Sequence, residues 1–318
     1  MEDRKLIAYS FIKQGFPKSK VLSLSGVPKS SYYYKPTNKE KGSRTSTHTK
    51  TKSGKLVSNE TVQLVIRELL SEEFVDYGYL KVCWWLRRNK DYIINPKKVY
   101  RLMREEGLLN LKTPVKRGKR NWVKDLLPQT EQPFDFLEFD IKYIYVAGVN
   151  RNALLLTVID VNTRWVLGHY LHWQIKGREL ISLFNQIFEV YPLPKHFHVR
   201  NDNGSQFIAQ QVQQYFKDKE VVQEFCKPAT PQQNAHIESY HSIVERVICS
   251  KYEFEDLLES QDTFNRFVVF YNKLRIHSGI GYQSPGDYLL ENNIDMNGLE
   301  LQKTLDCSTL QWKILNQA

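Results

Sequence analysis

The spacing of apolar residues changes character near residue 133. Upstream of this point apolar side chains recur every three to four positions, which predicts helices. Downstream, short segments that alternate with a period of two are interleaved with longer helical segments, which predicts a mixed α/β domain. We expect strands at 134–145, 152–161, 164–172, 196–200 and 221–226, and helices at 177–191, 206–219, 234–250 and 260–275.

The first 36 residues predict three short helices around a Gly26 turn, in the size and order of a helix-turn-helix unit. The expected helices span 3–15, 18–24 and 28–34. The segment SGVPKSSYYYK is the candidate groove-reading piece, in which Lys29, Ser30 and Tyr32 can reach phosphates or base edges. A small helical cap with solvated lysines is the alternative.

Residues 57–110 predict a second helix-turn-helix-like domain with three helices. The first begins near Ser58, the second near Gly78, and the third at Asn95-Pro96, a favourable pair for a helix start. On the third helix, Val99, Leu102 and Met103 should pack inward. A basic stripe on the same helix is expected to face DNA phosphates: Lys97, Lys98, Arg101 and Arg104.

Two stretches rich in Lys and Arg predict linkers, and the first of them contains almost no apolar residue. Residues 37–56 predict a flexible basic linker. Residues 111–130 predict a second basic linker, which could follow a DNA backbone. The second carries the candidate phosphate contacts Lys116, Arg117, Lys119 and Arg120. The expected organisation is therefore a helix-turn-helix region at 1–36, a linker at 37–56, a second helix-turn-helix-like domain at 57–110, a second linker at 111–130, an α/β core at 131–292 and a C-terminal tail at 293–318.

Charge is distributed unevenly between the two halves of the chain. Residues 1–125 hold 28 Lys+Arg and 12 Asp+Glu (net +16), and residues 126–318 hold 17 and 23 (net −6), which sum to +10. A basic arm beside an acidic core fits a protein that binds a polyanion and needs cations. The four cysteines form no paired motif, and no long apolar run predicts a membrane span. We expect a cytoplasmic protein that acts on DNA.

One face of the strand expected at 134–145 is acidic. Glu138, Asp140 and Lys142 share that face because side chains alternate along a strand. Asp202 follows the strand expected at 196–200, and Glu238 lies near the start of a helix that Asn234 can cap. A gap of 35 residues, 203–237, separates these last two acids.

Three converging carboxylates require cations or strongly raised pKa values. Two of them about 4 Å apart repel by roughly 4 kcal/mol at an effective dielectric of 20. Magnesium prefers oxygen ligands, and two such ions can stabilise the attacking and leaving oxygens of a phosphodiester displacement. On this hypothesis water or a DNA 3′-hydroxyl attacks, and no side chain acts as a covalent nucleophile.

Several motifs carry a resemblance to a known family over about residues 1–290: YGYLKV, FDIKYI, VIDVNTRWVLG, NDNGSQF, NAHIESYHS and YNKLRIHSGIGYQSP. The chain resembles bacterial insertion-sequence transposases of the DDE class, and more narrowly the orfB product of the insertion-sequence-three family. The resemblance implies an RNase H-like, integrase-type catalytic core, two Mg²⁺ or Mn²⁺ ions held by Asp140, Asp202 and Glu238, and DNA cleavage with strand transfer. It also implies double-stranded DNA as partner, a homo-oligomer on DNA, and an upstream orfA product or fusion.

Some positions depart from the family pattern. Lys142 stands where Thr is common, and Glu245 stands where Lys or Arg is common, seven residues after Glu238. Arg246 is a candidate DNA contact, but it points about 80° away from Glu238 around the helix and is a poor substitute for that cation. His241 is either a DNA contact or an ordinary surface histidine. Arg275 either contacts DNA or braces the core.

Three functions remain open at this stage. A transposase explains the acids together with the two helical units. An RNase H-like nuclease would not need those units, and a transposase-derived DNA-binding regulator would not need the intact acids. We take the transposase as the leading hypothesis.

Overall fold

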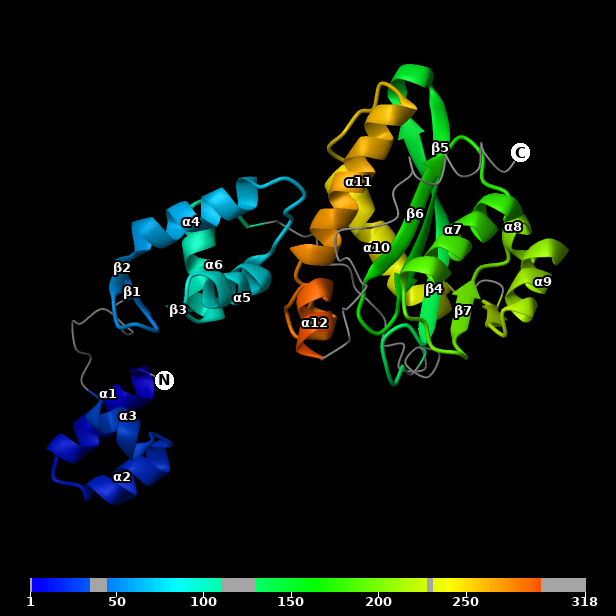
Figure 1. Cartoon of the computed structure of the whole chain (residues 1–318). Coiled ribbons are helices and arrows are strands. Elements are labelled where there is room, and N and C mark those ends of the chain that lie inside the picture. Colours follow the sequence, from blue (N-terminus) through cyan, green and yellow to red (C-terminus); the bar gives the residue numbers. More distant parts are fainter. Residues whose placement is uncertain (1, 35–44, 110–127, 129, 228–230, 293–318) are drawn as a thin grey trace. The chain divides into compact units, whose positions relative to one another are not determined.

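The computed structural model describes residues 2–34, 45–109, 128, 130–227 and 231–292. The chain divides into two compact units, Met1–Ser46 and Thr47–Ala318 (Figure 1). Within the described ranges, no helix is long and apolar enough to cross a membrane.

The first unit consists of three short helices, α1 (Glu2–Lys13), α2 (Lys18–Ser25) and α3 (Lys29–Tyr33). This confirms the three helices predicted from the sequence. Gly26 ends α2 in the left-handed region, with φ 63°, a conformation that glycine adopts without steric cost. Ala8, Leu22 and Val27 form the small core, and Tyr32 packs against it.

The second unit begins with a small sheet and three helices. The strands are β1 (His48–Thr51), β2 (Leu56–Ser58) and β3 (Tyr92–Ile93), in the order β2-β1-β3, and the helices are α4 (Asn59–Ser71), α5 (Tyr79–Asn89) and α6 (Pro96–Glu105). The predicted flexible linker at 37–56 is wrong from residue 48 onward, because Thr49 and Thr51 are buried on one side of β1. Asn95 caps α6, and Val99, Leu102 and Met103 are fully buried, as predicted.

The α/β region contains a five-stranded sheet in the order β6-β5-β4-β7-β8. Its strands are β4 (Phe136–Val146), β5 (Arg151–Asp160), β6 (Val166–His172), β7 (His198–Asn201) and β8 (Val222–Phe225). The first three pair antiparallel, and β7 joins β4 and β8 in parallel. All five strands predicted from the sequence are confirmed.

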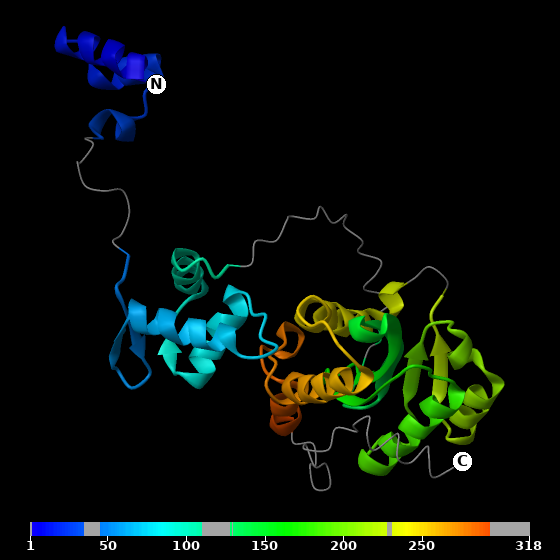
Figure 2. The same ribbon diagram turned by 90° about the horizontal axis from the view of Figure 1, so that it is seen from above.

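Helices cover both faces of this sheet. They are α7 (Gly177–Val190), α8 (Ser205–Ile208), α9 (Gln210–Asp218), α10 (Ala235–Val244), α11 (Leu257–Lys273) and α12 (Pro285–Glu291). Figures 1 and 2 show α10 and α11 on one face, and α7 with α9 on the other.

Two predicted helices are interrupted. The helix expected at 206–219 divides into α8 and α9 because Ala209 has an extended backbone, with ψ 133°. The helix expected at 234–250 is α-helical only to Val244 and continues as the π-helix η4 (Glu245–Cys249).

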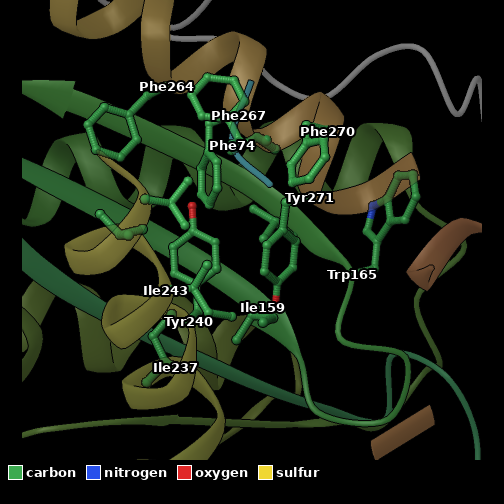
Figure 3. Close-up of a cluster of buried hydrophobic side chains, with 14 of the residues drawn as sticks. Phe74, Ile159, Trp165, Ile237, Tyr240, Ile243, Phe264, Phe267, Phe270 and Tyr271 are labelled. Carbon is green, nitrogen blue, oxygen red and sulfur yellow. The ribbon is translucent and has the colours of Figure 1, made fainter. Parts of the chain in front are cut away.

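An aromatic cluster fixes α10 and α11 against the sheet (Figure 3). Tyr240 of α10 meets Tyr271 of α11 at 5.0 Å between ring centroids, edge to face. Phe74, from the segment between α4 and α5, meets Phe267 of α11 at 5.4 Å. The segment that precedes α5 therefore packs on the same helix that covers the sheet, and helps to hold α10 in place.

Candidate active site

Asp140 and Asp202 lie on neighbouring parallel strands. The ladder between β4 and β7 pairs Phe136 with His198 and Glu138 with Arg200, an offset of 62 residues. The same offset brings Asp140 level with Asp202, the first residue after β7. Adjacent strands are about 4.8 Å apart, so the register sets these two acids side by side at the end of β7.

Glu238 approaches from the helix layer. It lies in the first turn of α10, a helix that packs on β4 and β5, and its side chain is exposed. Asp202 is also exposed, and its Oδ1 accepts a hydrogen bond from the Gly204 N–H at 2.8 Å. Two solvated acids thus flank a largely buried one.

Burial, together with weaker repulsion from the carboxylates of Asp202, Glu238 and Glu138, raises the pKa of Asp140 to about 7. A hydrogen bond from the Ile141 N–H to Asp140 Oδ1, at 2.8 Å, opposes it. The structure therefore brings Asp202 and Glu238 within electrostatic reach of Asp140. Repulsion of this kind is relieved when a cation binds among the acids.

His241 lies on α10, one turn after Glu238, and contacts Asp140. Its Nδ1 is 3.5 Å from Asp140 Oδ2, and only 7% of the residue is exposed. Burial, and to a smaller extent the nearby Lys142 charge, lower the pKa of His241 to about 4. The imidazole is therefore neutral near pH 7, so this contact is not an ion pair and leaves the negative charge of the acids uncompensated.

The three acids do not form a closed metal cage. Among the residues that the structure describes, no group of three or more His, Cys, Asp and Glu side chains is placed so that it could hold a metal ion. The donor set still fits a hard divalent cation, because it offers carboxylate oxygens and keeps two of the three acids exposed. Magnesium commonly retains several waters and needs few protein ligands.

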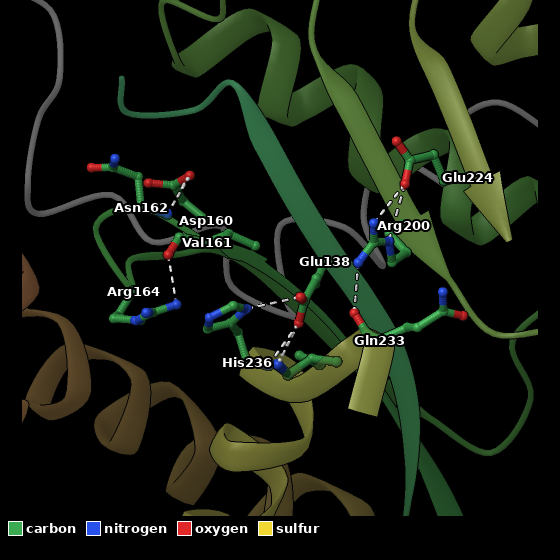
Figure 4. Close-up of polar contacts among 10 residues, drawn as sticks. Glu138, Asp160, Val161, Asn162, Arg164, Arg200, Glu224, Gln233 and His236 are labelled. Atoms are coloured by element: carbon green, nitrogen blue, oxygen red, sulfur yellow. Dashed lines mark hydrogen bonds and ion pairs between the residues drawn. The ribbon is translucent and has the colours of Figure 1, made fainter. Parts of the chain in front are cut away.

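Glu138, which the sequence analysis placed on the acidic face, is fully buried. Its Oε2 accepts hydrogen bonds from the backbone N–H groups of His236 (2.9 Å) and Ile237 (2.8 Å), and its Oε1 accepts one from His236 Nδ1 (2.9 Å) (Figure 4). The expectation that Asn234 caps this helix is wrong: Asn234 is buried and makes no side-chain cap to the described part of α10. Glu138 supplies the cap instead.

The two departures from the family pattern pair with each other. Lys142 Nζ lies 2.9 Å from Glu245 Oε2. The hydrogen bond from Lys142, and then the charge of Lys142, lower the pKa of Glu245. The positive charge that is common at position 245 of the helix is thus supplied by Lys142 on β4. Lys142 also neutralises Glu245, the acid that stands at that position.

Three predicted DNA contacts in the core have other partners. Arg275 is 1% exposed and lies 2.7 Å from Asp76 Oδ1, and Arg246 lies 3.1 Å from Asp76 Oδ2. His241 is buried against Asp140. These side chains make their described contacts within the core, and DNA binding by them stays a prediction. The signal missed in the sequence is Asp76, an acid 199 residues before Arg275.

Two of the four residues in the basic stripe on α6 have partners within the protein. Lys98 donates to the His48 carbonyl at 2.6 Å, which ties α6 to β1, and Arg101 pairs with Glu105 at 3.1 Å. Lys97 and Arg104 are exposed. In the first unit Lys29 and Ser30 are exposed, whereas Tyr32 packs against its core. Lys116, Arg117, Lys119 and Arg120 lie outside the described residues.

Comparison with protein families finds two kinds of domain. An HTH-like domain matches residues 58–117, and two models of an integrase core domain match residues 130–231 and 219–285. The integrase core matches span the sheet and the helices that carry the three acids. With the sheet order given above, they confirm the predicted RNase H-like, integrase-type core.

Related proteins come from bacterial insertion sequences. The transposase of insertion sequence element IS904 of Lactococcus lactis is 27% identical over 71% of this chain and 95% of its own length. The transposase InsD of insertion element IS2D of Escherichia coli is 24% identical over 74% and 79%. A 39.2 kDa protein of insertion element IS476 of Xanthomonas euvesicatoria is 27% identical over 61% of this chain, which spans only 55% of that protein.

Solved structures with a similar core come from retroviruses. The HTLV-2 integrase catalytic core domain, in complex with magnesium, gives a TM-score of 0.38 with 17% identity, over 48% of this chain and 94% of that chain. A chain of the simian T-cell lymphotropic virus intasome, in complex with the PP2A regulatory subunit B56 gamma, gives 0.43 with 12% identity, over 73% and 74%.

Proposed function

Since the chain belongs to the insertion-sequence transposases that carry an integrase core domain, we propose that it cleaves DNA at the ends of its element and transfers the strands to target DNA. Asp140, Asp202 and Glu238 are the residues that hold two Mg²⁺ or Mn²⁺ ions. The observation that carries the proposal is the matched register of Asp140 and Asp202, with a pKa of about 7 at Asp140 caused in part by its acidic neighbours.

Each acid has a distinct task in this proposal. Asp140 presents its oxygens from a rigid central strand, and Asp202 does so from the end of the adjacent one. Glu238, exposed on α10, completes the set from the other side. The bound ions supply positive charge that offsets carboxylate repulsion and polarises the scissile phosphate. Water or a DNA 3′-hydroxyl is the nucleophile, and the neutral His241 leaves the acids available to cations.

The partners follow from the same proposal. The terminal repeats and the target are double-stranded DNA, and the exposed Lys29, Lys97 and Arg104 are the described cations suited to its phosphates. The protein acts as an oligomer that holds two DNA ends. An upstream orfA product, or a fusion to it, supplies a further segment for assembly.

The test uses a labelled duplex that carries the end of the element, with Mg²⁺ and with or without the upstream orfA segment. Wild-type protein should nick and join this duplex. Asp202→Asn should lose both reactions by at least about 100-fold, because one carboxylate ligand is removed. Asp218→Asn, which neutralises an exposed acid on α9, is the matched control and should keep both.

The other outcomes separate the alternatives. Cleavage of RNA–DNA hybrids without strand joining would favour an RNase H-like nuclease. Tight binding of the duplex without any cleavage, even with the upstream segment present, would favour a DNA-binding regulator. Full activity of Asp202→Asn would contradict the assignment of the acids.

A further inference from the structure

The acidic face of β4 meets α10 and the start of η4 at three successive positions. Glu138 contacts His236, Asp140 contacts His241, and Lys142 contacts Glu245. We call these six residues the β4–α10 seam.

The two elements of the seam advance in step. Two residues along a strand cover about 6.7 Å, and the five- and four-residue steps along the helix cover about 7.5 and 6 Å. Strand and helix therefore keep the same register along the whole seam. A shift of α10 by one turn would break every one of these contacts at once.

One end of the seam is fixed by Glu138. His236 and Ile237 are the second and third residues of α10, whose N–H groups have no acceptor within the helix. Glu138 accepts both of these N–H groups and the His236 ring N–H, so a buried anion sits at the positive end of the helix. The other end is fixed by the ion pair of Lys142 and Glu245.

Asp140 and Glu238 lie between these two anchors, one on the strand and one on the helix. We propose that Glu138, together with His236, is a positioning residue that sets the height of α10 along β4 and hence the separation of the Asp140 and Glu238 carboxylates. The inference rests on the proposed function, in which these carboxylates hold the metal ions. Glu138 is not itself a ligand here, because both of its oxygens are bound and the residue has no exposed surface.

Glu138→Gln tests the anchor with little change in volume. Both backbone N–H groups bind one oxygen of this carboxylate, and the His236 ring nitrogen, which donates or accepts according to its tautomer, binds the other. A glutamine replaces this charged acceptor by a neutral amide that must turn its N–H₂ toward His236, so the charge-assisted bonds to the start of α10 are weakened. We expect Mn²⁺ affinity, read from the EPR signal of free Mn²⁺, and the kcat for nicking each to fall about 10- to 100-fold. KM for the DNA duplex should stay within about twofold, because DNA-facing cations are untouched.

The matched control is Glu179→Gln. Glu179 is a buried carboxylate that caps another helix, α7, by accepting the Lys176 N–H at 2.8 Å. Its loss should lower thermal stability and leave Mn²⁺ affinity and kcat unchanged. A second pair separates positioning from folding: His236→Ala should weaken Mn²⁺ binding, and His236→Asn, which keeps a side-chain donor near the Nδ1 position, should restore most of it.

Two results would overturn the inference. One is a folded Glu138→Gln protein whose Mn²⁺ affinity and kcat match those of wild type. The other is His236→Ala binding Mn²⁺ as tightly as His236→Asn does, which decides the matter if Glu138→Gln does not fold.

Failure of the proposed function looks different. Wild-type protein would then neither nick DNA nor bind Mn²⁺. The anchor itself would still be tested by hydrogen exchange at the His236 and Ile237 amides, which should accelerate in Glu138→Gln and stay constant in Glu179→Gln. Unchanged protection of both amides in Glu138→Gln would remove the anchor as well.

Discussion

At the scale of single residues, the charge of Asp140 opposes folding. Burial, and then the neighbouring carboxylates, raise its pKa from an ordinary 3.8 to about 7. Between these two values the unfolded chain loses a proton that the folded protein keeps. The free energy of unfolding therefore falls as pH rises through this window, and the penalty is complete above about pH 7.

Asp140→Asn should remove this penalty in metal-free protein. The asparagine keeps an oxygen for the Ile141 N–H but carries no charge, so the variant should be more stable than wild type at pH 8. Since each pKa unit is worth about 1.4 kcal/mol, we expect a gain on the order of 2–4 kcal/mol at pH 8 and a smaller one of roughly 1–2 kcal/mol at pH 5. Urea denaturation at both pH values measures it, with Asp218→Asn as the control. An equal gain at both pH values would contradict the explanation.

The site residues that could be predicted from the sequence have a pattern within their own segment, whereas those that were missed depend on contacts between distant segments. Asp140 follows from the alternation of side chains along its strand, and Asp202 from its position directly after a strand, and the structure places both there. The Glu138 cap joins residues 98 positions apart. No local pattern indicates which polar side chain on a strand meets the free N–H groups of a distant helix, so the nearby Asn234 was the reasonable but wrong choice.

At the scale of elements, the strands were predictable and the helix interruptions were not. Alternation of apolar residues identifies each strand of the large sheet, whereas β1 contains only His, Thr and Lys and resembles a linker. The π-helical turn η4 continues the apolar spacing of α10, so the sequence shows one long helix. Such changes of backbone follow from tertiary packing, which the pattern of a single segment does not contain.

Asp76 connects elements that lie far apart in the sequence. It precedes α5 and binds Arg275, which follows α11, and Arg246 of η4. Burial alone would raise the pKa of Asp76, but the charges of Arg275, Lys81 and Arg246 and the Arg275 hydrogen bond lower it. This carboxylate is therefore ionised in the folded protein and neutralises a buried guanidinium.

Asp76→Ala should destabilise the second unit strongly. It leaves the guanidinium of Arg275, which is 1% exposed, without its partner, and breaking a buried pair in this way costs about 3–5 kcal/mol. Urea denaturation gives the loss in the free energy of unfolding. Asp262→Ala breaks an exposed pair with Arg266 on α11 and should cost no more than about 0.5 kcal/mol. Similar losses for the two variants would show that the Asp76 contacts contribute little.

At the scale of the whole molecule, each unit has its own hydrophobic core. Residues 1–46 hold 10 Lys+Arg and 3 Asp+Glu, a net charge of +7. In the described part of this unit, the buried hydrophobic core consists of Ala8, Leu22 and Val27. A small unit with this charge is suited to phosphate contact, and the larger unit can fold without it.

Removal of residues 1–46 should therefore separate DNA binding from folding. The fragment that begins at Thr47 should unfold within about 2 °C of the second unit of the full chain, because its core is complete. Its affinity for DNA should fall, and the slope of log K against log salt should decrease by about 0.9 for each phosphate that the protein no longer neutralises. Lys29→Gln in the full chain is the single-site comparison, with an expected decrease near 1 if this exposed lysine meets a phosphate. A fragment that binds DNA with unchanged affinity and salt slope would exclude the first unit from the DNA interface and leave that role to the cations of the second.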